Sequence, residues 1–446
     1  LLADAHHRDL RVILDLVPNH SSDRHPWFEE SRRSRDSERR DWYIWRDPAP
    51  DGGPPNNWRS EFGGSAWELD EATGQYYYHA FAVEQPDLNW RNREVREAMY
   101  DVMRFWLNRG VDGFRVDVMW HLMKDEHFRA NPENPDYVPG EMSDYRRVLP
   151  AFSTDQPEVH GVVSEMRAVL EEYDERLLIG EIYLPVERLV DYYGPNGDGA
   201  HLPFNFHLIT TPWDARQIEI VIDRYEGALP DDAWPNWVLG NHDQPRVASR
   251  VGDAQARVAA TLLLTLRGTP TLYYGDELGM HDVTIPAERA LDVREMTDPG
   301  LGFGRDPQRT PMQWDRSEAA GFTTGSPWLP LPADSAQRSV QAERDEPSSM
   351  LSLHRRLLAL RRRESALAVG GYRPLAATGT LLAFQRHHRG RRLGVVLNLG
   401  SEPQRWPVPA SIRPGRVLLR AADRFEGPWR PEVDIPADEA VIFEID

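Results

Sequence analysis

The feature that most restricts how this chain can fold is a repeated alternation of short apolar segments with helical segments. Between residues 94 and 110, apolar side chains recur at helical spacing, and Gly110 marks the end of the helix. The next segment, VDGFRVDV (111–118), has the β-branched, apolar character of a buried strand. Apolar strands that alternate with helices form parallel sheets with both faces covered. The sequence therefore predicts an α/β fold.

The same unit recurs along the chain. Strands are expected at residues 11–16, 111–118, 177–183, 203–209, 236–243 and 269–279, and helices at 94–110, 160–174, 256–268 and 349–367. This order predicts a (β/α)8 TIM barrel.

Two segments depart from the alternation. Residues 21–90 are irregular and rich in Pro, Gly and Trp, and they are too long for a plain loop. From residue 368 onward, short alternating segments predict an antiparallel β-sandwich. We expect a barrel from residues 1–20 and 91–367, an inserted domain B from 21–90, and a C-terminal sandwich from 368–446.

Composition excludes several classes of partner. The formal charge of −19 argues against nucleic acid and against an anionic membrane surface. The apolar run at residues 261–268 is far too short to span a bilayer. The absence of cysteine excludes disulfides and thiolate metal sites, and it favours a reducing, cytoplasmic location. The oligomeric state stays open.

Polar residues of catalytic type stand at the ends of the predicted barrel strands. In a (β/α)8 barrel, residues at the carboxyl ends of the strands face one mouth, where active sites lie. A helix cap or a buried ion pair would explain one such residue, but several convergent carboxylates favour a functional site. The residues are Asp15, Asn19, His20, Arg115, Asp117, Glu181, Asn241, His242 and Asp243.

Convergent carboxylates are suited to glycosyl transfer, which needs an ionised nucleophile and a proton donor. Asp117 is the expected nucleophile, because Arg115 two residues before it shares its strand face and favours the charged carboxylate. Glu181, at the end of an apolar strand, is the expected acid/base, with its pKa raised by desolvation. Asp243 is expected to bind sugar hydroxyls. No metal and no cofactor are expected.

Four ordered motifs resemble those of the α-amylase family of glycoside hydrolases. They are DLVPNH (15–20), GFRVD (113–117), the strand end at Glu181, and NHD (241–243). The resemblance implies a retaining double displacement with Asp117 as nucleophile, Glu181 as acid/base and Asp243 as transition-state stabiliser. It also implies substrate-binding roles for Arg115, His20 and His242.

Further segments resemble the α-glucosidase and oligo-1,6-glucosidase branch of that family. They are QPDLNW (85–90), NNWRSEFGGSAW (56–67) and GRDPQRTPMQWD (304–315). The resemblance implies that Arg309 helps to close the pocket around the terminal glucose. It also implies that Phe62 and Phe81 line the pocket wall, with core packing as the alternative for both. Val118, directly after the expected nucleophile, favours α-1,6 linkages, and α-1,4 linkages stay open.

The expected function is an exo-acting α-glucosidase for short maltose-type or isomaltose-type oligosaccharides. Trehalose-6-phosphate hydrolase, trehalose synthase and sucrose isomerase are alternatives within the branch. A catalytically silent, transporter-associated scaffold is an alternative of another class, and it predicts the loss of one or more carboxylates.

The start of the chain carries an expectation of its own. In the family, the segment RVILDL (11–16) corresponds to the third barrel strand, so the first two strands are expected to be missing here. An aspartate that pairs with Arg309 in relatives, and any calcium-type loop near the first strand, would be missing with them. Because open sheet edges are unfavourable, we expect residues 1–446 alone to be neither stable nor active, although the parent protein is an enzyme.

Overall fold

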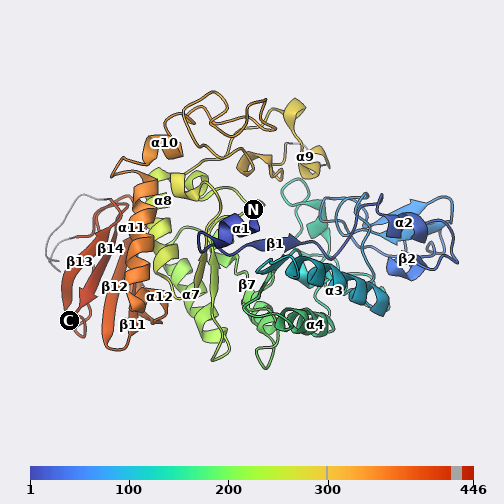
Figure 1. Ribbon diagram of the computed structural model, residues 1–446, viewed down its shortest axis with the longest axis horizontal. Coiled ribbons are helices and arrows are strands. Elements are labelled where there is room, and N and C mark those ends of the chain that lie inside the picture. Colours follow the sequence, from blue (N-terminus) through green and yellow to red (C-terminus); the bar gives the residue numbers. More distant parts are fainter. Residues whose placement is uncertain (298–299, 423–433) are drawn as a thin grey trace. The chain divides into compact units, whose positions relative to one another are not determined.

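The computed structural model describes residues 1–297, 300–422 and 434–446. The chain, drawn as a ribbon in Figure 1, forms two compact units. The first unit contains Leu1–Phe204, Pro230–Ala233 and Leu291–Gly304, and the second contains Asn205–Leu229, Trp234–Ala290 and Arg305–Asp446. In these described ranges, no helix is both long enough and apolar enough to cross a membrane.

A parallel sheet forms the centre of the first unit. Its strands are β1 (Ile13–Leu16), β5 (Gly113–Val116), β6 (Leu177–Gly180) and β7 (Leu202–Pro203), hydrogen-bonded in that order. The register aligns Leu16 with Val116, and Val116 with Gly180. The residues that follow these three strands therefore leave the sheet at one edge.

Close packing between strands fixes the residue at the start of β5. Gly113 has φ +154°, and a Cβ atom at this position would overlap the carbonyl oxygen of Leu177 on β6. Only glycine allows the two backbones to approach this closely. The register between β5 and β6 thus depends on glycine, which has no side chain, at position 113.

Two amphipathic helices of the first unit follow the predicted pattern. Helix α3 (Arg93–Leu107) begins at Asn92, whose side chain accepts a hydrogen bond from the Glu94 N–H. Its buried residues include Val95, Met99 and Met103, as the helical spacing predicts. Helix α4 (Val159–Glu171) buries its apolar face in the same way and contacts both α3 and β6. The short helices of this unit are α1 (Leu2–His6), α2 (Pro26–Ser31), α5 (Val186–Leu189) and α9 (Val293–Thr297).

The segment 21–90 has an aromatic core. It contains the three-stranded antiparallel sheet β2–β4–β3, formed by Trp45–Arg46, Gln75–Tyr78 and Trp67–Asp70. One cluster packs Ile44, Trp58, Ala66, Trp67, Tyr76, Tyr78 and Ala80 together. Isolated β-bridges join His20 to Asp87 and Tyr43 to Leu88, so both ends of the segment lie side by side.

Much of the tryptophan of this protein is structural. The structure buries many of these side chains. The buried tryptophans include Trp42, Trp45, Trp58, Trp67, Trp90, Trp120, Trp237 and Trp406. Burial of a large ring contributes up to several kcal/mol of hydrophobic free energy (about 25 cal/mol per Å²), which accounts for their presence.

The second unit contains a shorter parallel pair and long helices. Strand β8 (Asn236–Val238) pairs in parallel with β9 (Thr269–Thr271). The helices of the second unit are α6 (His207–Thr210), α7 (Ala215–Ala228), α8 (Val247–Thr265), α10 (Val340–Glu343), α11 (Met350–Arg363) and α12 (Ser365–Ala368). The strand predicted at 203–209 is wrong beyond Pro203, because the Asn205 side chain accepts from the His207 N–H and helix α6 begins there.

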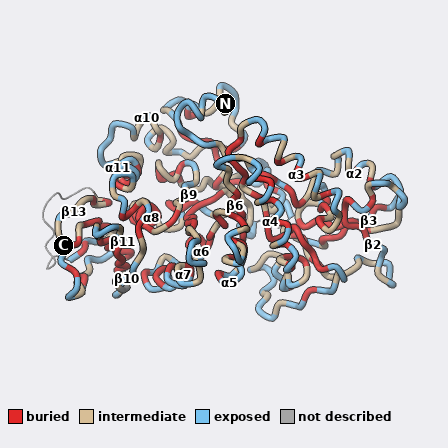
Figure 2. Tube along the Cα trace, turned by 60° about the horizontal axis from the view of Figure 1, so that its bottom comes forward, coloured by how far each residue is buried: buried red, intermediate tan, exposed pale blue. Residues whose placement is uncertain are grey.

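The carboxyl-terminal part of the second unit is an antiparallel sheet. Its strands are β10 (Gly371–Thr378), β11 (Leu381–His388), β12 (Arg391–Asn398), β13 (Pro414–Arg420) and β14 (Ala440–Ile445), in the order β10–β11–β12–β14–β13. Helices α7, α8 and α12 contact the sheet (Figure 1). Strand β11 is buried over most of its length (Figure 2). The predicted antiparallel arrangement is confirmed; in the described part of the chain these strands form one sheet, so the second sheet of a sandwich stays a prediction.

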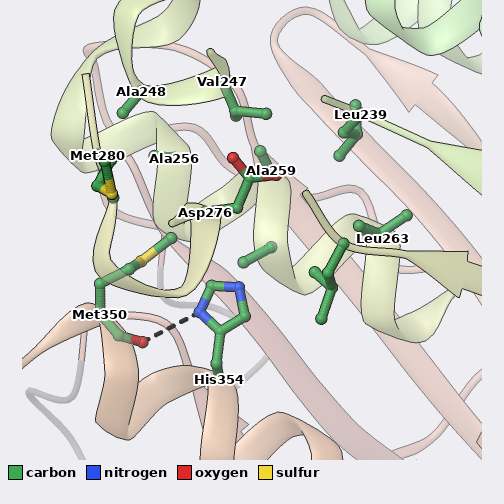
Figure 3. A pocket seen from close by; sticks show the side chains of 13 residues that line it. Leu239, Val247, Ala248, Ala256, Ala259, Leu263, Asp276, Met280, Met350 and His354 are labelled. Atoms are coloured by element: carbon green, nitrogen blue, oxygen red, sulfur yellow. Dashed lines mark hydrogen bonds between the residues drawn. The ribbon is translucent and has the colours of Figure 1, made fainter. Parts of the chain in front are cut away.

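A small apolar pocket lies between α8, α11 and the loop after β9 in the second unit (Figure 3). Leu239, Val247, Leu263 and Met280 line it, and the carboxyl group of Asp276 stands among them. Burial raises the pKa of Asp276 to about 7, although the positive charge of Arg246 opposes this shift. The side chain is therefore neutral in the folded protein at mildly acidic pH.

We predict that Asp276→Asn stabilises the protein increasingly as the pH rises. In the unfolded chain this aspartate releases its proton near the ordinary value of 3.8, whereas in the folded protein its pKa is about 7. The stability of the wild type is therefore greatest at low pH through this group and falls as the pH passes through 7. The free energy of unfolding of the variant, relative to wild type, should rise by up to about 3 kcal/mol between pH 5 and pH 8.

Urea unfolding at both pH values measures this difference. The matched control is Asp345→Asn, which makes the same substitution at an exposed position. An equal advantage of Asp276→Asn at pH 5 and pH 8 would contradict the prediction.

Candidate active site

One guanidinium group gathers the carboxylates at the edge of the first-unit sheet. Arg115 Nη1 lies 2.7 Å from Asp15 Oδ1 and 2.8 Å from Asp117 Oδ1, and Arg115 Nη2 lies 2.5 Å from Glu181 Oε2. The sheet register produces this arrangement, because Asp117 N–H donates to Leu16 O and Glu181 N–H donates to Val116 O. The pairing of Arg115 with Asp117, predicted from their spacing, is present.

The three carboxylates keep Arg115 in its charged form. Its burial lowers the pKa of the guanidinium, but the attraction of Glu181, Asp15 and Asp117 outweighs burial, and the net pKa is raised. The arginine is therefore a permanent positive charge at this edge. Its side chain is only 13% exposed, so the attraction to the carboxylates is weakly screened by water.

Glu181 stands in an environment that the sequence described only in part. Its side chain is 3% exposed, and such desolvation disfavours the charged form as predicted. The structure adds two opposing contacts, the ion pair with Arg115 and a hydrogen bond of 3.1 Å from the Val118 N–H to Glu181 Oε2. Both stabilise the ionised carboxylate. The expected rise in the pKa of Glu181 by desolvation stays a prediction, because these two contacts oppose it.

Val118 has an unusual backbone conformation. The predicted strand extends to residue 118, but β5 ends at Val116. Val118 lies in the left-handed region, with φ 42° and ψ 49°. A β-branched residue in this region is strained by roughly 1–2 kcal/mol. The turn leads into a short 3-10 helix, Met119–His121, and it directs the Val118 N–H towards Glu181.

His20 lies within the same unit, against Phe81. The two rings are 5.2 Å apart, and Phe81 is in turn 5.5 Å from Phe62. Burial lowers the pKa of His20, and the charges of Asp87 and Asp117 offset this only in part. The imidazole is therefore neutral at neutral pH, which suits a hydrogen-bonding role.

A buried polar network holds the His20 loop to the segment 21–90. Lys124 Nζ lies 2.5 Å from Asp87 Oδ2 and donates to Asn19 Oδ1 at 2.8 Å. Asn19 Nδ2 donates to Asp87 Oδ2 at 2.8 Å, and Gln85 Nε2 lies 3.1 Å from His20 Nε2. Burial lowers the pKa of Lys124, which Asp87 opposes.

Sequence reasoning assigned no role to Gln85, Asp87 or Lys124 of this network. Gln85 and Asp87 belong to the motif QPDLNW, which served only to suggest a branch of the family. Their contacts give that motif a physical role, since they fix the position of His20. Lys124 gave no signal in the sequence, because its partners are remote in the chain.

The remaining predicted residues form a second cluster in the second unit. Asp243 Oδ1 accepts from Arg309 Nη2 at 2.8 Å and from Arg305 Nη1 at 3.2 Å, and it lies 3.5 Å from His242 Nε2. Arg309 Nε also donates to the main-chain carbonyl of His242 at 2.9 Å. Arg305 was missed, although it stands four residues before Arg309 in the same motif.

The predicted site residues therefore come together in two groups. Within the first unit, His20, Phe62, Phe81, Arg115, Asp117 and Glu181 are connected by ion pairs, ring contacts and charge interactions. Within the second unit, His242, Asp243 and Arg309 are in direct contact. In the described residues, no cluster of three or more His, Cys, Asp or Glu side chains is arranged to hold a metal ion.

We predict that Arg115→Gln destabilises the protein more at pH 7 than at pH 5. The substitution leaves Glu181 and Asp117 without their shared cation, and breaking a buried ion pair costs about 3–5 kcal/mol. Without Arg115, one of the folded carboxylates should bind a proton more tightly than when unfolded. The stability lost at pH 7 should then be partly recovered at pH 5.

Urea unfolding of the variant and the wild type at both pH values measures this loss. Arg93→Gln is the matched control, because Arg93 is 83% exposed and pairs with Glu97 one helical turn away. A loss for Arg115→Gln that is the same at both pH values would rule out the shared-cation interpretation.

The sequence of this chain is similar to those of known proteins over most of its length. The model of the family "Alpha amylase, catalytic domain" matches residues 1–370. A probable alpha-glucosidase of Rhizobium meliloti (strain 1021) is 38% identical over 433 residues, covering 92% of this chain and 77% of the relative. An oligo-1,6-glucosidase of Heyndrickxia coagulans is 37% identical over 450 residues, covering 92% and 80%.

A solved structure is similar over the whole chain. The alpha-glucosyl transfer enzyme XgtA is 34% identical, with a TM-score of 0.92 that covers 100% of this chain and 84% of that one. The resemblance drawn from the four motifs is thus confirmed by sequence and by fold. The chain belongs to the α-amylase catalytic-domain family.

Proposed function

We propose that this protein is a retaining, exo-acting α-glucosidase that releases glucose from the non-reducing end of short α-glucosides. The proposal is carried by the pair of carboxylates at the ends of β5 and β6. Asp117 and Glu181 follow adjacent parallel strands and contact different nitrogens of one guanidinium. Two carboxylates on the two sides of a glycosidic bond are the chemical requirement of this reaction. The identity with α-glucosidases and oligo-1,6-glucosidases supports the same substrate class.

In the first step, Glu181 donates a proton to the glycosidic oxygen while Asp117 attacks the anomeric carbon. The bond between the anomeric carbon and that oxygen breaks, and the second sugar leaves as an alcohol. In the second step, Glu181 takes a proton from water, which attacks the same carbon and releases glucose from Asp117. The opposing influences on Glu181 fit these two roles, since burial favours the protonated form and Arg115 favours the ionised form.

Asp243 is proposed to stabilise the transition state, with His242 and Arg309 as substrate-binding residues. The family model matches residues 1–370, which include residues of both units, and this supports assigning them to one catalytic domain. On this proposal, residues 1–20 and 91–367 contribute to the barrel, 21–90 form an inserted domain B, and 368–446 form a separate C-terminal domain.

The proposed substrate is a small neutral oligosaccharide. The chain carries a net charge of −19, which disfavours polyanionic ligands. Its lack of cysteine suits a reducing environment, so we place the enzyme in the cytoplasm. All three proposed catalytic carboxylates are present, which favours an enzyme over a catalytically silent scaffold.

We predict hydrolysis of isomaltose and maltose in a panel that also contains sucrose, trehalose and trehalose-6-phosphate. The reason is the carboxylate pair together with Val118, whose side chain borders the proposed nucleophile. Glucose release measured for each sugar gives its kcat/KM. A clear preference for trehalose-6-phosphate would instead indicate a trehalose-6-phosphate hydrolase. Rearrangement of sucrose without glucose release would indicate a sucrose isomerase.

Asp117→Asn is the control for that panel. The amide keeps the shape of the side chain but is a poor nucleophile, so turnover should fall by about 10³-fold or more with an unchanged circular-dichroism spectrum. Unchanged turnover would remove Asp117 from the nucleophile role.

We also predict that the released glucose first appears as the α-anomer. Two displacements at one carbon restore the original configuration, whereas a single displacement by water inverts it. Proton NMR during the first minutes of isomaltose hydrolysis distinguishes the two anomers before mutarotation. An initial β-anomer would exclude the covalent mechanism.

A further inference from the structure

Glu61 is a carboxylate of the first unit that the proposed mechanism does not use. It precedes Phe62, and its N–H donates to the carbonyl of Ala80 at 2.8 Å, next to Phe81. Its side chain keeps 15% of its surface exposed. It therefore stands on the aromatic wall formed by Phe62 and Phe81, within reach of solvent.

Three side chains from separate parts of the sequence are directed at this carboxylate. His121 Nε2 lies 3.5 Å from Glu61 Oε1, and Arg294 Nη2 lies 3.5 Å from Glu61 Oε2. Burial and the nearby charge of Glu61 raise the pKa of the Tyr145 hydroxyl. A carboxylate with polar or charged side chains on several sides has little freedom to reorient, so its remaining acceptor capacity has a fixed direction.

His121 is an incompletely satisfied group beside Glu61. It is 1% exposed, and neither of its ring nitrogens has a hydrogen-bond partner in the described residues. Leaving a buried polar group unpaired costs about 1–3 kcal/mol. Such a deficit is a common property of binding sites whose ligand completes the hydrogen bonding.

A row of rings connects this cluster to the proposed catalytic residues. His121 lies 5.4 Å from Phe81, which lies 5.2 Å from His20. His20 is close enough to Asp117 for the charge of that carboxylate to affect its pKa. Glu61 is thus connected to the proposed catalytic residues through the rings of His121, Phe81 and His20.

We propose that Glu61 is a specificity-determining residue that accepts hydrogen bonds from hydroxyl groups of the second sugar unit. This inference rests on the proposed α-glucosidase function and assigns a residue to the leaving-group side of the same site. A carboxylate accepts strong hydrogen bonds from hydroxyl groups, and the ring of Phe62 offers an apolar face to the same sugar.

The charge of Glu61 also selects against an anionic second unit. Arg294 does not provide a free cation there, since its guanidinium lies over the ring of Phe62 at 5.6 Å and pairs with Glu61. Because Glu61 and Arg294 neutralise each other, a phosphate on the second sugar would find no net positive charge to bind there. Neutral disaccharides are therefore favoured over their phosphorylated forms.

The test compares Glu61→Gln with wild type on isomaltose and on p-nitrophenyl α-glucoside, whose leaving group has no sugar hydroxyls. The ratio of kcat/KM for isomaltose to that for the aryl glucoside should fall by about tenfold, because a hydrogen bond to a charged group is replaced by a neutral one. In the same variant, the ratio of kcat/KM for trehalose-6-phosphate to kcat/KM for trehalose should rise several-fold, because Arg294 loses its carboxylate partner.

Glu68→Gln is the matched control, because it makes the same change at an exposed position on β3. Thermal melting of Glu61→Gln checks that the fold is retained, and Glu61→Asp should recover part of the lost selectivity. Ratios within twofold of wild type in an active Glu61→Gln enzyme would overturn this inference alone. A wild-type protein that cleaves neither isomaltose nor the aryl glucoside would instead overturn the proposed function and this assignment with it.

Discussion

The ion pairs of Arg115 are the interaction on which the arrangement of the first unit depends. A parallel register places Asp15, Asp117 and Glu181 at one edge, where three negative charges would repel each other. One guanidinium with two separate nitrogens neutralises part of this charge and sets the positions of all three groups. Asp117 and Glu181, which have proposed chemical roles, are thereby both held by Arg115. A movement of one carboxylate would shift the guanidinium and so affect the other.

The second constraint is the attachment of the aromatic segment 21–90. A segment with its own core could move as a body, and His20 lies at its start. The buried contacts of Asp87 with Asn19 and Lys124 oppose such movement, because breaking them would leave charges unpaired inside the protein. The wall that carries Phe62 and Glu61 is thus held to the strand that carries the first motif, although about forty residues separate them in the sequence.

The sequence predicted the strands well where apolar runs were bounded by turn residues, as at Ile13–Leu16 and Leu177–Gly180. It failed at 203–209, where an apolar run fits both strand and helix and a hydrogen bond from the His207 N–H to the Asn205 side chain decides for the helix. The pairing of Arg115 with Asp117 followed from local periodicity. The contacts of Arg115 with Glu181, and of Lys124 with Asp87, join residues tens of positions apart, so no local pattern could show them.

The left-handed turn at Val118 has a consequence for attempts to redesign this site. Val118 directly follows the proposed nucleophile in the sequence, and its main-chain N–H is bonded to Glu181. A substitution that relaxes the strained turn would shift this N–H and alter the proton affinity of Glu181. On the proposal that Val118 influences linkage preference, a substitution at this position changes linkage preference and the protonation of Glu181 together.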